Sequence, residues 1–228
     1  MNSHIIYFSF LLAIGGQLPF NWVSFEMEKR ANRDGKTTTL NAKVYFGRQG
    51  DMVTNFTHPV EVMIVNNKEG ELTVYNPELN SVYQSVNYQT GSESTTFYYF
   101  LMNQTQDMGL KRIGFELADT KVDGKLLISY WEPPREIEGL ADIELVRSER
   151  KPIFMGYRDK KGNYIKKVFY YDYEYQRGFN FPMSITEIDY LDKDSIVSKT
   201  TFKSFNFDYA ADLDMLRFEI PADATLEK

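Results

Sequence analysis

The sequence predicts an all-β protein, a sandwich or a barrel-like antiparallel sheet, and three observations support this. Apolar and polar residues alternate along stretches such as Leu40 to Phe46, the pattern of a strand with one buried face. Aromatic residues make up 15% of the 228-residue chain and fall mostly in these runs, which favours β structure. Turn residues recur at spacings of about 8–12 positions, which are typical of short antiparallel strands.

The first half of the chain alternates from Trp22 onwards. Val23 to Met27 forms the first expected strand, and Arg33-Asp34-Gly35 predicts a hairpin turn into a partner strand from Thr37 to Phe46. No helical period precedes Leu40. Gly-Asp, His-Pro and Asn-Pro pairs then interrupt the alternation. Between and beyond these pairs, strands are expected at residues 52–56, 60–64, 72–75 and 82–88.

A short helix is predicted from Ser92 to Asn103. Ser92 can cap its start, and an acid follows in the first turn. Phe97, Phe100 and Leu101 then recur at helical spacing. This aromatic stripe has two overlapping interpretations, a plug that closes one end of the sheet as core and a lid over a ligand cavity.

After this helix the pattern becomes a regular antiparallel meander. Strands are expected at residues 115–120, 125–131, 143–146, 152–157, 164–175, 183–191, 195–207 and 215–220. No linker, low-complexity tract or internal repeat divides the chain. We therefore expect a single domain over residues 17–228, with a core of substantial size.

The first residues indicate export. Ile5 to Ile14 is an apolar run that is too short to span a bilayer and is followed by small residues. We interpret residues 1–16 as a secretory signal peptide, so the mature protein is expected to begin near Gly16 or Gln17. The alternative is a first buried strand of the domain. No other run is long enough for a transmembrane helix.

Composition excludes several classes of function. A net charge of −6 and an isoelectric point near 5.1 argue against a nucleic-acid partner. The chain has no cysteine, which excludes disulfides, Cys-ligated metals and a cysteine nucleophile. It also excludes the lipid-bearing cysteine of a bacterial lipoprotein, so we expect that the protein carries no lipid anchor of its own.

Motifs for catalysis are scarce. His58 is the only histidine expected in the mature chain, and it stands beside Pro59 at a strand interruption, where a lone histidine is more often structural than catalytic. No Gly-rich phosphate loop or nucleophile elbow occurs. The segments from Asp192 to Asp194 and from Asp208 to Asp214 lack the pattern of a calcium loop and are interpreted as solvated turns. We predict no catalytic residue, no metal, no cofactor and no enzymatic activity.

Three segments resemble one known family. Val44 to Met52, Thr57 to Pro59 and Gly70 to Val82 are similar to the LolA-like carriers of outer-membrane lipoproteins, in which a strand ends in a basic residue before a turn. The resemblance implies a strongly curved antiparallel sheet, a half-open β-barrel, with a short helical lid or plug. It also implies that acyl chains of a lipoprotein or lipid occupy an apolar cavity. The best-known carriers open with an amphipathic helix, whereas this chain opens with a strand.

A curved sheet of this length has more inward-facing apolar side chains than one short helix can cover, so the remainder is expected to form a cavity. Its expected walls are Val44, Phe46, Phe56, Val62, Ile64 and Val74, with Phe97, Phe100 and Leu101 as the cover. Arg48 matches the basic residue that the family uses in handing over its cargo. An exposed turn arginine is the alternative for Arg48.

The resulting hypothesis is a soluble, monomeric periplasmic carrier that shuttles lipoproteins or lipids toward the outer membrane. Its partners would be an inner-membrane releasing complex and an outer-membrane acceptor. Charges at Lys166-Lys167 argue against an outer-membrane barrel, and a secreted enzyme lacks a nucleophile and base pair. The alternative that stays open is a non-catalytic sensor or assembly module of the same fold that binds a protein or peptide.

Overall fold

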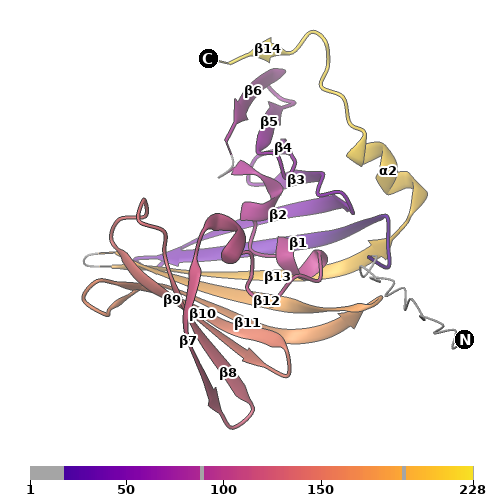
Figure 1. The fold of residues 1–228 in the computed structure, drawn as a ribbon. Coiled ribbons are helices and arrows are strands. Elements are labelled where there is room, and N and C mark those ends of the chain that lie inside the picture. The colour runs from indigo at the N-terminus through magenta and orange to yellow at the C-terminus, as the bar shows by residue number, and fades with distance from the viewer. Residues whose placement is uncertain (1–17, 88–89, 192–193, 228) are drawn as a thin grey trace, which may run out of the picture.

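The computed structural model describes residues 18–87, 90–191 and 194–227, and within them fourteen strands form one curved, open sheet (Figure 1). The expected signal peptide therefore lies outside the described residues. The strands are β1 (Trp22–Arg33), β2 (Lys36–Gly47), β3 (Met52–His58), β4 (Val62–Asn66), β5 (Glu71–Asn76), β6 (Ser81–Val86), β7 (Glu116–Asp123), β8 (Leu126–Glu132), β9 (Leu140–Ser148), β10 (Lys151–Asp159), β11 (Tyr164–Gln176), β12 (Phe179–Tyr190), β13 (Ser195–Phe207) and β14 (Thr225–Leu226).

The sheet consists of two antiparallel meanders, β1 to β6 and β7 to β13, which are joined where β1 pairs with β13. Its order is β14-β6-β5-β4-β3-β2-β1-β13-β12-β11-β10-β9-β8-β7, and only the short β14 pairs in parallel, with β6. The first meander runs outward from β1 to β6, and the second returns from the far edge at β7 to β13. The chain between them is described from residue 90 to 115, here called the crossing segment, and it leads from one half of the sheet to the other. It does so on the concave side, where the magenta segment lies in Figure 1.

The expected mainly β architecture is confirmed, down to the turn that starts the first hairpin. Asp34 and Gly35 both have positive φ, 49° and 74°, and Arg33 pairs with Lys36 across the turn. This two-residue turn has the twist that suits antiparallel strands, which is why an Asp-Gly pair predicts it. A strand also opens the described part of the chain, as the missing helical period before Leu40 indicates.

The predicted helix from Ser92 to Asn103 is wrong as a single element. The segment contains a 3-10 turn, η2 (Ser92–Ser94), and one turn of α-helix, α1 (Tyr98–Leu101), and a second 3-10 turn follows at η3 (Lys111–Ile113). Thr95, which lies between η2 and α1, has extended backbone angles, φ −75° and ψ 139°. The β-branched pair Thr95 and Thr96 has low helix propensity, which explains why the helix does not run through.

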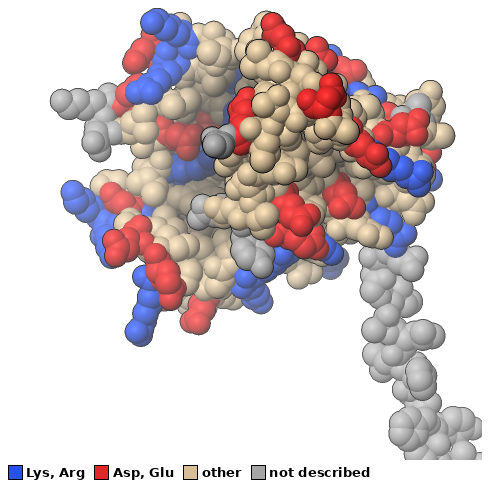
Figure 2. Space-filling view, turned by 90° about the horizontal axis from the view of Figure 1, so that it is seen from above, with Lys and Arg blue, Asp and Glu red and all other residues tan. Residues whose placement is uncertain are grey.

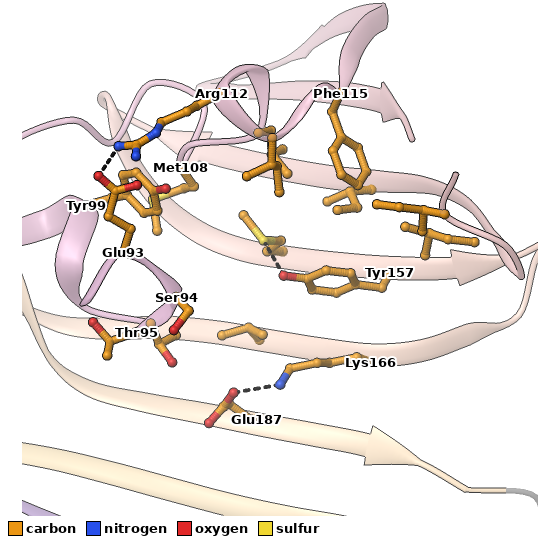
Figure 3. A pocket seen from close by; sticks show the side chains of 18 of the residues that line it. Glu93, Ser94, Thr95, Tyr99, Met108, Arg112, Phe115, Tyr157, Lys166 and Glu187 are labelled. Atoms are coloured by element: carbon orange, nitrogen blue, oxygen red, sulfur yellow. Dashed lines mark hydrogen bonds and ion pairs between the residues drawn. The ribbon is translucent and has the colours of Figure 1, made fainter. Parts of the chain in front are cut away.

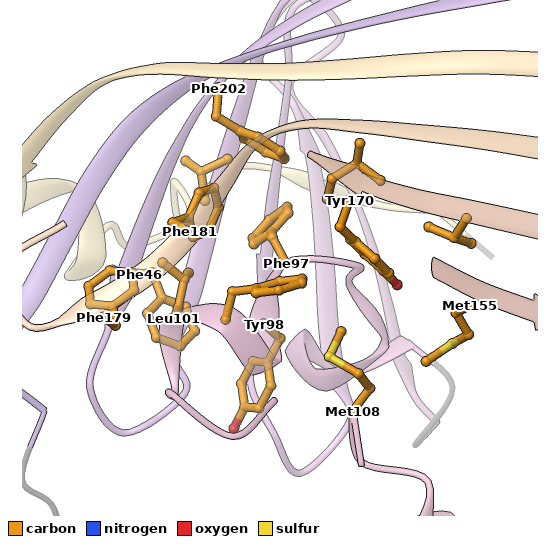
Figure 4. Close-up of a cluster of buried hydrophobic side chains, with 14 of the residues drawn as sticks. Phe46, Phe97, Tyr98, Leu101, Met108, Met155, Tyr170, Phe179, Phe181 and Phe202 are labelled. Atoms are coloured by element: carbon orange, nitrogen blue, oxygen red, sulfur yellow. The ribbon is translucent and has the colours of Figure 1, made fainter. Parts of the chain in front are cut away.

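The hydrophobic core fills the concave side of the sheet. Val23, Phe25, Val44 and Phe46 reach it from β1 and β2, and each is completely buried. Aromatic rings dominate the cluster, as Figure 4 shows for the side chains around Phe181 and Phe202. Ring centroids lie 5.1 Å apart in the Phe181–Phe202 pair and 5.5 Å apart in Phe25–Phe97, and both pairs are edge-to-face.

The convex side of the central strands is covered by the C-terminal segment. The strand that the sequence predicts at 215–220 is wrong, because a helix, α2 (Ala210–Leu216), covers its first two residues and irregular chain follows. β1 is already paired on both sides, so the chain after β13 finds no free strand beside it and packs on the outer face instead. Phe218 then packs against Tyr75, with ring centroids 5.9 Å apart.

Asp212 corrects the interpretation of residues 208–214 as a solvated turn. Its side chain is only 5% exposed and accepts hydrogen bonds from Ser24 Oγ at 2.5 Å and from Lys43 Nζ at 3.1 Å. Ser24 is completely buried between the sheet and α2. The carboxylate therefore fixes α2 to the convex face of β1 and β2.

We expect Asp212→Ala to lower the free energy of unfolding by about 2 kcal/mol, because it leaves a buried hydroxyl and a half-buried ammonium without their acceptor. Urea denaturation measures this. Asp214→Ala is the matched control, since Asp214 is exposed on the same helix. Equal losses in the two variants would contradict a role for Asp212 in fixing α2.

Candidate functional site

The concave side holds a cavity of about 780 Å³, here called the apolar pocket, between the crossing segment and the second meander (Figure 3). The strands β9 to β12 form one wall and the chain from Glu93 to Phe115 forms the other. It is lined by Lys68, Glu93, Ser94, Thr95, Thr96, Tyr99, Met108, Leu110, Arg112, Ile113, Phe115, Ile137, Leu140, Ile143, Met155, Tyr157, Lys166, Val168, Tyr170 and Glu187.

The sheet wall is apolar because alternate residues of neighbouring strands face the same way. Met155 of β10 pairs with Val168 of β11, and Ile143 of β9 pairs with Tyr157 of β10. Ile143, Met155 and Val168 are almost completely buried. The facing wall adds Met108 and Phe115, both also buried. Two methionines on facing walls give the pocket an adaptable surface, since the thioether chain is flexible.

A tight contact shapes the facing wall. Gly109 has φ +78°, and a Cβ atom there would lie 2.0 Å from the Tyr99 hydroxyl oxygen. Only glycine therefore allows the Tyr99 ring of the α1 segment to lie against the chain before η3. At the rim, Arg112 forms an ion pair with Glu93, and the Tyr98 hydroxyl donates to the same carboxylate at 3.2 Å. These contacts tie η2, α1 and η3 together over the pocket.

Buried charges occupy one end of the apolar pocket. The Glu187 carboxylate, with its side chain 9% exposed, bridges Lys29 Nζ at 2.9 Å and Lys166 Nζ at 2.8 Å. Lys166 also lies 3.4 Å from a carboxylate oxygen of Asp189. Each buried charge thus has a partner of opposite sign, which is the condition for tolerating charge in an apolar setting.

These pairs shift two pKa values in opposite directions. Burial alone raises the pKa of the Glu187 carboxyl, but the hydrogen bond from Lys166 and the charges of Lys29 and Lys166 lower it by more, to below its ordinary value. Burial alone lowers the pKa of the Lys166 ammonium, and Glu187 raises it by more. Both groups are therefore charged at neutral pH.

Two tyrosines, Tyr157 and Tyr170, line the apolar pocket together with these charged residues. Tyr157 Oη donates to Met155 Sδ at 3.1 Å, which is a weak bond. Tyr170 is buried, and its hydroxyl makes no hydrogen bond with another described residue. Burial raises the pKa of both phenols, so they remain protonated donors. The apolar pocket thus pairs an apolar wall with a hydrogen-bonding, charged end, the arrangement that suits an amphiphile.

None of the ten site residues predicted from sequence lines the apolar pocket, although nine of them lie on the concave side of the sheet. Five of them, Val44, Phe46, Phe97, Phe100 and Leu101, are buried in the core cluster. Four are half-buried on the same face of β3 to β5, namely Phe56, Val62, Ile64 and Val74. Arg48 is exposed at the β2–β3 turn, where its Nη1 donates to Asn21 Oδ1 at 3.2 Å.

The residues that do line the apolar pocket come mainly from the second meander and the crossing segment. A sequence signal existed for one of them: Glu187 occupies an inward position of β12, in register with Val168 and two residues from buried Ile185. A charge in an alternating apolar strand marks a site that must be paired. No comparable signal marks Met108 or Phe115, because their position depends on how the crossing segment folds back.

Comparison with known proteins identifies the fold. No protein-family model matches this sequence, and neither does any curated protein. Solved structures do match over most of the chain. A domain named as an outer membrane lipoprotein-sorting protein from Vibrio parahaemolyticus has a TM-score of 0.60 at 13% identity, covering 87% of this chain and 92% of its own.

Two further structures agree. A LolA superfamily protein from Nitrosomonas europaea has a TM-score of 0.57 at 12% identity, covering 85% of this chain and 89% of its own. A DUF1329 family protein from Desulfovibrio piger has a TM-score of 0.58 at 16% identity, covering 84% and 87%. The chain therefore has a LolA-like fold, as its sequence resemblance implies. In the described part of the chain, no helix has the length and apolar character needed to cross a membrane.

Proposed function

We propose that this protein is an exported periplasmic carrier that binds the acyl chains of lipoproteins or other lipids and moves them toward the outer membrane. The apolar pocket carries this proposal: a cavity of about 780 Å³ with an apolar wall and a charged, hydrogen-bonding end. Its size falls within the range of roughly 300–1,000 Å³ found for small-molecule sites. The LolA-like fold, shared with a domain named for lipoprotein sorting, supports the same function.

In this proposal acyl carbons lie along Ile143, Met155 and Val168, and the polar head meets Lys166 and the tyrosine hydroxyls. The domain spans residues 17–228 and acts as a monomer without catalysis. The core residues predicted from sequence, such as Phe100 and Leu101, support the pocket from behind. An inner-membrane releasing complex and an outer-membrane acceptor are the proposed partners.

Arg48 contributes to hand-over in this proposal rather than to cargo binding. Its side chain is exposed at the β2–β3 turn, and among the described residues its guanidinium has one side-chain partner, Asn21, so most of its donors are available to a docking partner. An exposed, multiply donating cation is suited to docking a membrane component. Figure 2 shows charged side chains of both signs spread over one face of the molecule, which a docking partner could also use.

Narrowing the apolar pocket tests the binding step. Leu140→Trp places a larger apolar side chain on the lining and adds no buried charge, so we expect the affinity for a pyrene-labelled hexadecanoic acid to fall about tenfold. Val122→Trp, at an edge strand where the side chain is 75% exposed, is the control for added aromatic surface. Fluorescence titration gives both affinities, and thermal melts verify that both variants fold.

The wild-type protein should also accelerate transfer of this probe between donor and acceptor vesicles in proportion to its concentration. Probe binding without transfer would favour the sensor or assembly module that the sequence leaves open. Equal affinities for Leu140→Trp and the wild type would place the acyl chain elsewhere and contradict this site.

A further inference from the structure

A second cavity, here called the basic pocket, lies at the other end of the concave strands. It has a volume of about 970 Å³. Along β10 its lining includes Lys151 and Pro152, whereas Met155 and Tyr157 further along the same strand line the apolar pocket. The crossing segment divides in the same way, since Lys111 lines the basic pocket and Arg112 lines the apolar pocket. The two cavities therefore have separate linings on one face of the sheet.

The basic pocket gathers unpaired positive charge in an acidic protein. Four cations line it, Lys111, Arg147, Arg150 and Lys151, against two carboxylates, while the whole chain carries a net charge of −6. Among the described residues none of these four cations lies within 4.0 Å of a carboxylate. The cations of the apolar pocket differ, since Lys166 and Arg112 are both paired. The surplus charge of the basic pocket is thus left for a ligand.

Arg147 adds a second, independent observation. It is half-buried on the concave face of β9, and its Nε atom is buried without a hydrogen-bond partner. An unsatisfied buried donor is destabilising, and more so when the group is charged. An oxyanion bound in the pocket would accept a hydrogen bond from Nε. Such a ligand would explain why this charged nitrogen is buried without a partner in the protein.

The hairpin turn between β9 and β10 supplies a third observation. Ser148 pairs with Lys151, and the two residues between them, Glu149 and Arg150, have φ of 49° and 70°. Such turns favour Asn-Gly, because a left-handed backbone conformation is unfavourable for a residue with a long side chain. At the cost of this strain the turn places a guanidinium, rather than a glycine, on the lining.

Aromatic rings hold two of the cations without neutralising them. Lys111 Nζ lies 5.9 Å from the centroid of the Trp131 ring, and Lys151 Nζ lies 5.6 Å from that of Tyr173. A ring face orients an ammonium group as a carboxylate would, but it leaves the full positive charge available to an anion.

We propose that the basic pocket binds a phosphate group, carried either by a lipid headgroup or by a small soluble phosphorylated molecule. The excess of two positive charges matches a phosphate monoester, which is close to dianionic at neutral pH. Two guanidinium groups provide the planar donor pairs that suit phosphate oxygens. Amide side chains at Asn103 and Asn180 are available for the hydroxyl groups of such a ligand.

Trp131 provides the signal for the test. It lines the basic pocket, and Trp22 is the other tryptophan of the chain, so Trp22→Phe leaves Trp131 as the single fluorescent reporter. The probes are glycerol 3-phosphate, lysophosphatidic acid below its micelle concentration, and a monoacylglycerol of the same chain length. We expect saturable changes in fluorescence with a phosphorylated probe and none with the monoacylglycerol.

The probes distinguish the source of the phosphate. Saturation by glycerol 3-phosphate and lysophosphatidic acid alike supports a soluble phosphorylated ligand, and saturation by lysophosphatidic acid alone supports a lipid headgroup. Saturation by neither, or by the monoacylglycerol as well, overturns the proposal. A basic pocket that binds no phosphate would leave acyl binding in the apolar pocket intact, so the two proposals fail separately.

Paired substitutions in two turns locate the site. In the Trp22→Phe background, Arg150→Gln with Lys151→Gln should weaken binding of the phosphorylated probe at least tenfold, because two charge-assisted contacts are lost. Lys160→Gln with Lys161→Gln makes the same change in charge at the exposed β10–β11 turn and should change affinity less than twofold. Equal losses in both variants would show a nonspecific charge effect and overturn the proposal. Thermal melts confirm that each variant is folded.

Discussion

Replacing Leu101 by glutamate is expected to unfold the protein at neutral pH. Leu101 is completely buried in α1, and Figure 4 shows it among the rings of the core cluster near Phe46 and Phe179. A carboxylate there has no cation to pair with in that cluster and must become protonated. A pKa raised by 3–5 units corresponds to about 4–7 kcal/mol, much of the stability of a typical domain.

Circular dichroism melts measure the effect, and two variants serve as controls. Leu101→Met keeps volume and polarity and should cost less than about 1.5 kcal/mol. Ile64→Glu introduces the same charge on β4, where the side chain is half-buried and can reach water, so this variant should fold. A cooperative, near-wild-type melt for Leu101→Glu would show that α1 is a movable lid instead of a plug.

Local sequence predicts the strands of this fold better than it predicts the segment around Leu101. Strands were predictable because alternation and turn chemistry are local, and Asp34-Gly35 specifies its hairpin with no help from the rest of the chain. The buried stripe of Phe97, Phe100 and Leu101 was also predictable as an apolar surface. The extended conformation at Thr95 was not, because tertiary packing decides between helix and turn in so short a segment.

The candidate site was less predictable than the fold. Met108 and Met155 of β10 line the same pocket although they lie almost fifty positions apart in the sequence, and this depends on where the crossing segment returns over a curved sheet. The apolar residues of β3 to β5 show the same alternation as those of β9 to β11, so periodicity alone cannot tell which half of the sheet borders a cavity. The burial of Asp212 was not predictable for a related reason, since its partners Ser24 and Lys43 lie far away in sequence on β1 and β2.

Replacing Glu187 by glutamine is expected to lower the free energy of unfolding by about 2–3 kcal/mol, or the melting temperature by about 5–10 °C. The change removes the charge that bridges Lys29 and Lys166 at the end of the apolar pocket. It leaves the Lys29 ammonium without an ion pair and the Lys166 ammonium with only the more exposed Asp189, at 3.4 Å. Removing one partner of a buried pair costs more, about 3–5 kcal/mol, but these lysine side chains are 37% and 33% exposed and recover part of their hydration.

Asp189→Asn is the matched control, because Asp189 also pairs with Lys166 but its side chain is 40% exposed. It should cost less than about 1 kcal/mol. Urea denaturation at neutral pH measures both variants. Equal effects would indicate that the Glu187 pairs behave as surface ion pairs and that the apolar pocket is more hydrated than its lining implies.

The same pairs predict how stability depends on pH. The native pKa of Glu187 lies below its ordinary 4.5, so its contribution is complete above that pH and is lost as pH falls through the native pKa. The native pKa of Lys166 lies above its ordinary 10.5, so its contribution is complete below that pH and is lost as pH rises through the native pKa. Denaturation midpoints measured from about pH 3 to 11 should therefore show a flat region between these limits for the wild type. Glu187→Gln should lower that region and reduce the acid slope; an unchanged acid slope would assign the pH dependence to other carboxylates.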